Sequence, residues 1–304
     1  MRNILFRTDS SSKIGTGHIM RDLVLANQYK KDKVVFACQD LENNINYKIT
    51  NAGYELELLE SNDIDKLISL IYKYQFDLIV IDHYEIDYKY EKLLKEKTGI
   101  EIFVMDDTYE KHHCDILLNH NIGAEASRYK DLLPEDAEIR CGVEYSLIRE
   151  EFKIEKKRNI TKVGSSKNVM IAIGGTDILN INLDILEVLK KFKNLKADIV
   201  TTTSNQNIDE LKSYIDDNNN FNLHINTNKM AKLMNQCDLI ITTPSVTINE
   251  VYYMEIPFIA IKVADNQKDI YEYLFKNNFS VMESFSNEIL YKLLIENIGG
   301  IENV

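Results

Sequence analysis

Short runs of apolar, β-branched residues alternate with longer amphipathic stretches along the whole chain. Parallel strands need a crossover of a dozen or more residues, usually a helix, so this alternation predicts an α/β fold with doubly wound parallel sheets. In the first half we expect strands at 3–7, 34–38, 78–81, 101–105 and 116–118, and helices at 18–29, 63–74 and 88–97.

A charged and polar segment interrupts the alternation near the middle of the chain. Residues 150–167 (EEFKIEKKRNITKVGSSK) hold few large apolar side chains and end in Gly and Ser, which is typical of a linker. Because 304 residues approach the upper size of a single core, we predict two domains, 1–150 and 151–304. In the second half we expect strands at 169–173, 197–201, 222–225, 239–242, 257–263 and 280–282, and helices at 178–192, 207–217, 230–236, 246–254 and 266–277.

Charge excludes some partners. The 36 Lys and Arg side chains against 48 Asp and Glu give a formal net charge of −12, which repels nucleic acid and anionic membranes at long range. No apolar run reaches the roughly 18 to 20 residues that span a bilayer, and the first residues (MRNILFRTDSSS) lack the apolar stretch of a signal peptide. A cytoplasmic protein without a nucleic-acid or membrane partner is therefore expected.

Cysteine and histidine spacing argues against a metal site. The four cysteines are scattered, which favours buried, reduced thiols over disulfides or zinc. Adjacent side chains on an extended chain point to opposite faces, so the run HHCD at 112–115 is not expected to surround one ion. The cysteines are Cys38, Cys114, Cys141 and Cys237.

A glycine-containing loop follows the first predicted strand, where ligands bind in open α/β sheets. In RTDSSSKIGTGHIMRD (7–22), Gly15 and Gly17 would let backbone N–H groups approach an anion, and His18 opens a helix. The positive end of the helix dipole disfavours imidazolium, which makes a neutral His18 a candidate general base. The alternative is a histidine that caps or packs the helix.

A second loop, IAIGGTD (171–177), has the form of a phosphate cradle. Gly174 and Gly175 follow an apolar strand, and Thr176 or Asp177 is predicted to cap the next helix. The loop lacks the Lys of a P-loop and the full spacing of a dinucleotide fingerprint, which argues against ATP hydrolysis and NAD binding. A tight turn without a ligand remains the alternative.

Two further strand ends carry polar residues. The strand 239–242 leads to Ser245 and to a helix with Glu250, a side chain that could accept both hydroxyls of a ribose but that taken alone would be a solvated surface residue. In IDHY (81–84), Asp82, His83 and Tyr84 stand at a strand end, where we favour substrate contact over loop capping.

Several motifs, taken in their order along residues 1–270, resemble one family, the UDP-2,4-diacetamido-2,4,6-trideoxy-β-L-altropyranose hydrolases of pseudaminic acid biosynthesis. The resemblance implies two Rossmann-like domains facing across a cleft, the glycosyltransferase-B architecture, with UDP held chiefly by the C-terminal domain. It also implies metal-independent, inverting attack of water on the anomeric carbon, which releases UDP, with no cofactor. The motifs are RTDSSSKIGTGHIMRD, IDHY, HHCDILLN, RCGVEYSLIREEF, IGGTD, SVTINE and the later NQ.

The resemblance also implies roles for individual residues. The family's base corresponds to His18 and its cleft tyrosine to Tyr84. The expected partner is a small UDP-sugar bound by a monomer, in a pathway that serves flagellin glycosylation. The substrate contacts correspond to Gly15, Thr16, Gly17, Arg149, Gly174, Gly175, Thr176, Glu250 and Asn266.

Two other function classes stay open on sequence grounds. One is a UDP-sugar glycosyltransferase of the same fold, which would need an acceptor site and usually an apolar or basic membrane-docking patch that we do not find in the sequence. The other is a non-catalytic nucleotide-sugar binding module, in which His18 would be structural.

Overall fold

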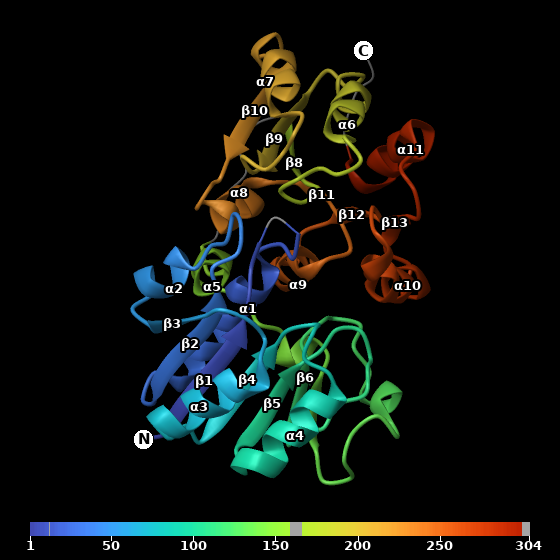
Figure 1. The fold of residues 1–304 in the computed structure, drawn as a ribbon. Helices are drawn as coiled ribbons and strands as arrows, with labels where there is room; N and C mark the ends of the chain where they lie inside the picture. The colour runs from blue at the N-terminus through green and yellow to red at the C-terminus, as the bar shows by residue number, and fades with distance from the viewer. Residues whose placement is uncertain (12, 159–165, 300–304) are drawn as a thin grey trace. The chain divides into compact units, whose positions relative to one another are not determined.

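The computed structural model describes residues 1–11, 13–158 and 166–299 and forms two compact units, Met1–Leu147 and Ile148–Val304 (Figure 1). Each unit is built on a sheet in which all paired strands run parallel, with helices between most successive strands. The α/β fold with two doubly wound sheets, predicted from the alternation of apolar runs, is thus confirmed.

The first unit has the strand order β3-β2-β1-β4-β5-β6-β7. Its strands are β1 (Asn3–Thr8), β2 (Lys33–Gln39), β3 (Glu55–Leu59), β4 (Leu78–Asp82), β5 (Glu101–Met105), β6 (Ile116–Asn119) and β7 (Glu138–Cys141). Its helices are α1 (Gly17–Ala26), α2 (Tyr47–Asn51), α3 (Ile64–Tyr74) and α4 (Tyr88–Thr98), with 3₁₀ turns at Asn27–Tyr29, Ala126–Tyr129 and Val143–Tyr145.

Alternation of side chains along the strands builds a core on each face of this sheet. On β1, Ile4 and Phe6 belong to the cluster that holds Ile19 of α1, whereas Leu5 belongs to the cluster that holds α3 and α4 residues. The rings of Phe6 and Phe36 stack with centroids 4.9 Å apart. Both faces of β1 are therefore covered, as expected for a parallel strand that reads as a continuous apolar run.

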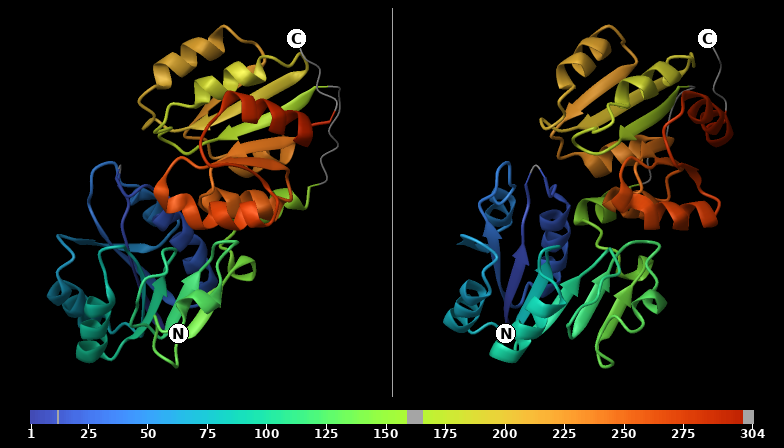
Figure 2. Two further views of the ribbon diagram at one scale, coloured as in Figure 1. Left: turned by 90° about the vertical axis from the view of Figure 1, so that its right-hand side faces the viewer. Right: turned by 45° about the vertical axis from the view of Figure 1, so that its right-hand side comes forward.

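The second unit has the strand order β10-β9-β8-β11-β12-β13, and Figure 2 shows its helices from two further sides. Its strands are β8 (Lys167–Ala172), β9 (Leu195–Thr201), β10 (Phe221–Ile225), β11 (Leu239–Thr242), β12 (Phe258–Ile261) and β13 (Ser280–Met282). Its helices are α5 (Glu150–Lys156), α6 (Asn182–Leu189), α7 (Ile208–Asp216), α8 (Met230–Gln236), α9 (Val246–Met254), α10 (Lys268–Lys276) and α11 (Asn287–Asn297), with a 3₁₀ turn at Asp265–Gln267.

The predicted linker at 150–167 is wrong over part of its length. Its beginning forms α5, which buries Phe152 and packs against α8 and α9, and its end, Lys167, is the first residue of β8. Residues 159–165 of that prediction lie outside the described residues. High charge does not exclude a helix here, because α5 buries only the side chains of Phe152 and Glu155 and leaves its other residues at least partly exposed.

The thiols lie where the scattered spacing predicted them. Cys38, Cys114 and Cys237 are buried and Cys141 is half-buried, and none of the four forms a disulfide. Burial raises the pKa of the Cys38 and Cys114 thiols far above the ordinary range and that of Cys141 to about 11.

Candidate active site

The strand orders place the predicted residues at one kind of position in both sheets. In each unit the chain runs outward from the first strand to the third and then returns to place the fourth strand on the other side of the first. This reversal of direction opens a crevice at the carboxyl ends of strands one and four. His18 follows β1 and Tyr84 follows β4, whereas Gly174 follows β8 and Glu250 follows β11. Each unit thus presents two of the predicted motifs at its own switch point.

A backbone bridge joins two residues of the loop before α1. The backbones of Ser11 and Gly15 form a bridge, with the Gly15 N–H donating to the Ser11 carbonyl at 2.8 Å, and Gly15 adopts a φ of 86°. Thr16 stands at the N-cap without a capping bond from its side chain, and no acidic residue lies in the first turn. The N-terminal amides of α1, with Thr16 and Gly17 partly or fully exposed, are therefore open to an anion.

His18 lies in the first turn of α1 and is only 6% exposed. Its ring meets the Tyr84 ring edge to face, with centroids 4.9 Å apart. Its Nδ1 lies 3.8 Å from Asp82 Oδ1 and has no hydrogen-bond partner in the described part of the chain. Burial lowers the pKa of His18 more than the Asp82 charge raises it, so the imidazole is neutral at pH 7.

A buried arginine ties the end of β4 to the loop after β5. Arg21 donates from Nε to Asp82 Oδ2 at 2.7 Å, from Nη2 to Asp82 Oδ1 at 2.5 Å and from Nη1 to Asp107 Oδ2 at 2.9 Å. The Tyr84 hydroxyl donates to Asp107 Oδ1 at 3.0 Å, while the Tyr84 side chain is 57% exposed. The Tyr84 hydroxyl is therefore held by Asp107, while its ring is exposed to solvent beside His18.

His83 does not fulfil the expectation of substrate contact. Its Nε2 lies 2.9 Å from Asp9 Oδ2 and its Nδ1 accepts from the Glu85 N–H at 3.1 Å, so both ring nitrogens are occupied inside the fold. Burial alone would raise the pKa of Asp9, but bonds from His83 and Arg7 lower it to about 2. Asp9 also accepts from the Gln39 N–H at 2.6 Å. Its bonds to His83, Arg7 and Gln39 therefore hold the start of the loop after β1 in place.

The GGTD turn in the second unit differs from the predicted strand-to-helix step. Gly174 adopts a φ of 90°, and the Gly175 carbonyl accepts from the Thr201 hydroxyl at 3.1 Å and from the Thr202 N–H at 3.2 Å. A Cβ on Gly175 would lie 2.6 Å from Thr202 Cγ2. Gly175 is therefore required by the close approach to the end of β9.

The prediction that Thr176 or Asp177 caps the next helix directly is wrong. Asp177, with a φ of 45°, begins a turn, and α6 begins only at Asn182. The Asp177 carboxylate reaches forward and accepts from the Ile181 N–H at 3.0 Å and the Asn182 N–H at 3.2 Å. The Asp177 carboxylate thus already accepts from two backbone N–H groups at the start of α6. The N–H groups of the turn, rather than those of the helix end, are therefore the ones left for a phosphate.

Helix α9 has a more open N-terminus. Ser245 is its N-cap and makes no capping bond, and the first turn carries no acidic side chain. The Ser245 hydroxyl instead lies 3.0 Å from the Thr243 hydroxyl. The partial positive charge of this helix end is available to an anion.

Glu250 and Arg149 form an ion pair within the second unit. Arg149 donates from Nε to Glu250 Oε1 at 2.7 Å and from Nη2 to Glu250 Oε2 at 3.0 Å, while its Nη1 lies 2.7 Å from Glu151 Oε1. Glu250 is 7% exposed, so the solvated position expected for it in isolation is wrong. Burial raises the pKa of Glu250, although the bonds from Arg149 oppose the rise.

Asn266 stands apart from this pair, in the 3₁₀ turn after β12. Asn266 is exposed, while its neighbour Gln267 is buried and accepts from the Val263 N–H at 2.8 Å. The turn therefore offers Asn266 to a ligand at the carboxyl end of the strand.

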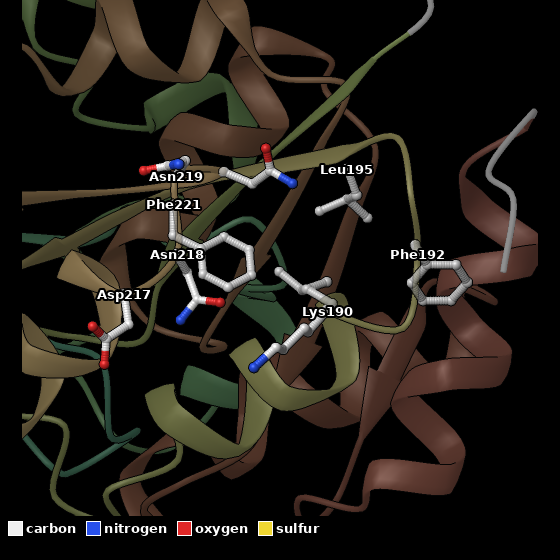
Figure 3. Close-up of a pocket in the computed structure, with 9 residues that line it drawn as sticks. Lys190, Phe192, Leu195, Asp217, Asn218, Asn219 and Phe221 are labelled. Carbon is white, nitrogen blue, oxygen red and sulfur yellow. The ribbon is translucent and has the colours of Figure 1, made fainter. Parts of the chain in front are cut away.

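A cavity of about 210 Å³ lies elsewhere in the second unit (Figure 3). Its wall is formed by the end of α6, the start of β9 and the turn at 217–221, so it opens at the amino ends of β9 and β10. This edge of the sheet is opposite to the one that carries the GGTD turn. The cavity is therefore not the predicted nucleotide site.

Within 1–11, 13–158 and 166–299, no group of three His, Cys, Asp or Glu side chains is placed to hold a metal ion. In the same ranges, no helix has the length and apolar character that crossing a bilayer requires.

Comparison with known proteins gives matches over most of the chain. A curated UDP-2,4-diacetamido-2,4,6-trideoxy-β-L-altropyranose hydrolase of Campylobacter jejuni is 44% identical over 278 residues, 91% of this chain and 98% of that protein. The uncharacterized protein MJ1062 of Methanocaldococcus jannaschii is 29% identical over 277 residues, 87% of this chain and 56% of that protein. No protein-family model matches the chain.

Solved structures of glycosyltransferases share the fold. MurG of Acinetobacter baumannii has a TM-score of 0.65 at 12% identity and covers 97% of this chain and 90% of its own. The spinosyn rhamnosyltransferase SpnG, solved with spinosyn aglycone, has a TM-score of 0.64 at 12% identity and covers 98% and 92%. At such identities the likeness shows the architecture alone, two Rossmann-like domains.

Proposed function

The chain belongs to the family of UDP-2,4-diacetamido-2,4,6-trideoxy-β-L-altropyranose hydrolases, and on this premise we propose that it hydrolyses that UDP-sugar to UDP and free 2,4-diacetamido-2,4,6-trideoxy-L-altrose. The observation that carries the proposal is the identity of 44% over 98% of the relative. A neutral, buried His18 at the switch point of the first sheet supplies chemistry that fits it.

In this proposal His18 is the general base. Water loses a proton to the imidazole as its oxygen attacks the anomeric carbon, and the bond to the UDP oxygen breaks with inversion. A neutral imidazole can accept that proton at pH 7, and such a base contributes typically 10²- to 10⁴-fold in rate. The exposed ring of Tyr84, in contact with His18, is proposed to touch the sugar.

The second unit is proposed to hold UDP. Open amides at the start of α9 and in the turn Gly174–Gly175–Thr176 would meet the diphosphate, and Glu250 would accept the ribose hydroxyls. Arg149 has five N–H donors, of which its carboxylate bonds use Nε, Nη1 and Nη2 once each, so donors remain for a phosphate oxygen. Arg149 would also hold Glu250 in place for the ribose.

Smaller contributions are proposed for the remaining residues. The loop Gly15, Thr16 and Gly17 would approach the substrate through backbone N–H groups, and exposed Asn266 would contact the nucleotide. We place the reaction in the cytoplasm, on a monomer without a nucleic-acid or membrane partner, in keeping with the net charge of −12.

The bond that breaks is the sharpest test of this function. Attack at phosphorus commonly enlists a divalent metal that bridges the phosphates, whereas attack at the anomeric carbon needs only a base and a stable leaving group. In ¹⁸O-labelled water we expect the label in the sugar and none in UDP, with turnover unchanged by a chelator. Label in the β-phosphate, or activity lost with the chelator, would refute the mechanism.

A glycosyltransferase is the second candidate, since the structural neighbours with TM-scores of 0.65 and 0.64 include MurG and a rhamnosyltransferase. The two readings differ in whether UDP release needs an acceptor other than water. Purified protein incubated with the UDP-sugar alone should release UDP to completion. Release only after an acceptor is added would favour the transferase, and binding without release would favour a non-catalytic module.

A further inference from the structure

Two buried aspartates stand near His18 in different surroundings. Asp82, the last residue of β4, is 1% exposed and bonded through both oxygens to Arg21. Asp22, one helical turn after His18 on α1, is 0% exposed, and neither of its carboxyl oxygens has a hydrogen-bond partner among the described residues. The mechanism outlined so far uses neither carboxyl group.

The surroundings give the two groups opposite charge states. Burial alone would raise the pKa of Asp82, but the Arg21 guanidinium holds it below the usual range, so Asp82 is an anion. Burial and the neighbouring Asp82 charge raise the pKa of Asp22 well above the usual range, so Asp22 is a neutral acid. The negatively charged Asp82 carboxylate and the neutral Asp22 carboxyl group, which has the same shape, therefore both lie close to the proposed base.

The geometry points to Asp82 as a positioning residue for His18 in the proposed hydrolysis. We propose that the Asp82 carboxylate accepts the Nδ1–H of His18, which leaves the lone pair on Nε2 for the attacking water. The Nδ1 to Oδ1 distance of 3.8 Å is longer than a hydrogen bond, and such contacts often tighten only when substrate is bound. Nδ1 has no other partner within the described ranges, so no competing bond opposes this tautomer.

The same carboxylate stabilises the product of proton transfer. As water attacks, its proton moves to Nε2, its oxygen bonds to the anomeric carbon, and the electrons of the breaking bond leave with UDP. His18 is then an imidazolium next to the Asp82 anion, and it returns its proton to solvent. The charged and titratable groups that act on the His18 ring are Asp82, Arg21, Asp107 and His83, with the Tyr84 ring against it.

Asp82→Asn and Asp22→Asn form a matched pair of variants. Asp82→Asn removes a charge and a fixed acceptor, and should lower kcat by roughly 10²-fold with little change in KM. It should also move the acid limb of the kcat profile to lower pH, by about one unit or more, because an opposite charge at this range raises a pKa by roughly 1 to 3 units. Asp22→Asn replaces a neutral acid by a neutral amide and should leave both quantities near their wild-type values.

Nuclear magnetic resonance of ¹⁵N-labelled histidine tests the positioning without any substrate. The unmodified protein should show the Nδ1–H tautomer of His18, and Asp82→Asn should mix the tautomers and lower the His18 pKa, whereas Asp22→Asn should do neither. An Nε2–H tautomer in the unmodified protein overturns the proposal even if Asp82→Asn fails to fold. Turnover within twofold of wild type in a folded Asp82→Asn variant overturns it as well. Failure to hydrolyse the UDP-sugar, with the expected tautomer present, would instead count against the proposed function.

Discussion

At the scale of single residues, burial sets the charge of the groups that we propose for the reaction. Burial lowers the pKa of His18 and keeps it neutral. Burial raises the pKa of Glu250, and the two bonds from Arg149 act in the opposite direction. The sequence placed both residues in helices that follow strand ends, because glycines and strand ends mark such positions. It did not reveal the Arg149 to Glu250 pair, since the partners are 101 residues apart and only the fold brings them together.

Glu250→Gln should weaken UDP binding. In the proposed complex the Glu250 carboxylate, held by Arg149, accepts the ribose hydroxyls, so the neutral amide would lose a charged hydrogen bond to the nucleotide, which is worth about 1.5 to 3 kcal/mol. Titration calorimetry with UDP should therefore show Kd raised by roughly 10- to 150-fold. Glu288→Gln, which breaks an exposed pair with Lys292, is the control and should leave Kd unchanged. If neither Glu250→Gln nor Arg149→Ala alters Kd, the nucleotide is bound by other residues.

His112 should make the stability of the first unit depend on pH. Its Nδ1 lies 2.7 Å from Glu91 Oε1 and its Nε2 3.7 Å from Asp106 Oδ1. Burial would lower the pKa of His112, but these two carboxylates raise it to about 9, above the unfolded value of about 6.5. The imidazolium therefore adds up to roughly 3 kcal/mol, fully present below pH 6.5 and lost as pH rises through 9.

Urea unfolding of His112→Gln and the unmodified protein at pH 6, 8 and 10 measures this contribution. The difference in free energy of unfolding should be largest at pH 6 and smallest at pH 10. The adjacent substitution His113→Gln is the control, because its side chain packs against Tyr88 rather than between the two carboxylates. A difference that stays constant from pH 6 to 10 would rule out an ion pair as its cause.

At the scale of helices and strands, continuous apolar runs predict the bounds of an element, whereas segments that mix charged and apolar residues do not. Buried strands such as β5 and β11 have the predicted bounds, because continuous apolar runs occur where both faces are covered. The strands β3 and β7, at the edges of the first sheet, mix charged with apolar residues and were missed. Helix α11 was missed too, although Leu290 and Leu294 on one of its faces are buried in the core.

Gly175→Ala should disturb the turn after β8. The added Cβ would lie 2.6 Å from Thr202 Cγ2 and 2.8 Å from Thr202 Oγ1, so the turn or the end of β9 has to shift, at a cost of about 1 to 3 kcal/mol. Both the free energy of unfolding and the affinity for UDP should fall. Thr202→Ala in the same chain should restore part of the loss by opening the space. Gly299→Ala meets no atom within 4 Å and serves as the control; equal effects of the two glycine substitutions would contradict the packing argument.

At the scale of the whole molecule, the two units repeat one strand order without a recognisable repeat in sequence. Each runs third, second, first, fourth, fifth, sixth strand, and the first unit adds β7 at the edge. Parallel sheets with right-handed crossovers could be expected from the alternation of strands and helices, but the order of the strands could not. The proposed division of labour does not follow from it, since we assign a base to one unit and nucleotide contacts to the other although they share this strand order.

This division predicts that chemistry and nucleotide binding separate on mutation. His18→Asn should lower kcat by roughly 10²-fold or more, because the proton acceptor is lost, while the UDP contacts of the second unit are untouched. Rapid-quench turnover and calorimetry with UDP measure the two effects in the same preparation. Near wild-type turnover would remove His18 from the mechanism, and a large loss of UDP affinity would contradict the separation.

The burial of the thiols has a practical consequence for following this reaction with an optical reporter. Alkylating dyes react with thiolates, and the raised pKa values of Cys38, Cys114 and Cys141 keep those sulfurs protonated near pH 7. A cysteine introduced at exposed Asn219, in the turn at the amino ends of the second sheet, would ionise more readily than they do. The fourth native thiol, Cys237, is fully buried. A fluorophore could therefore be attached at position 219 at neutral pH, on the edge of the sheet opposite to the residues proposed for UDP, without first removing the native cysteines.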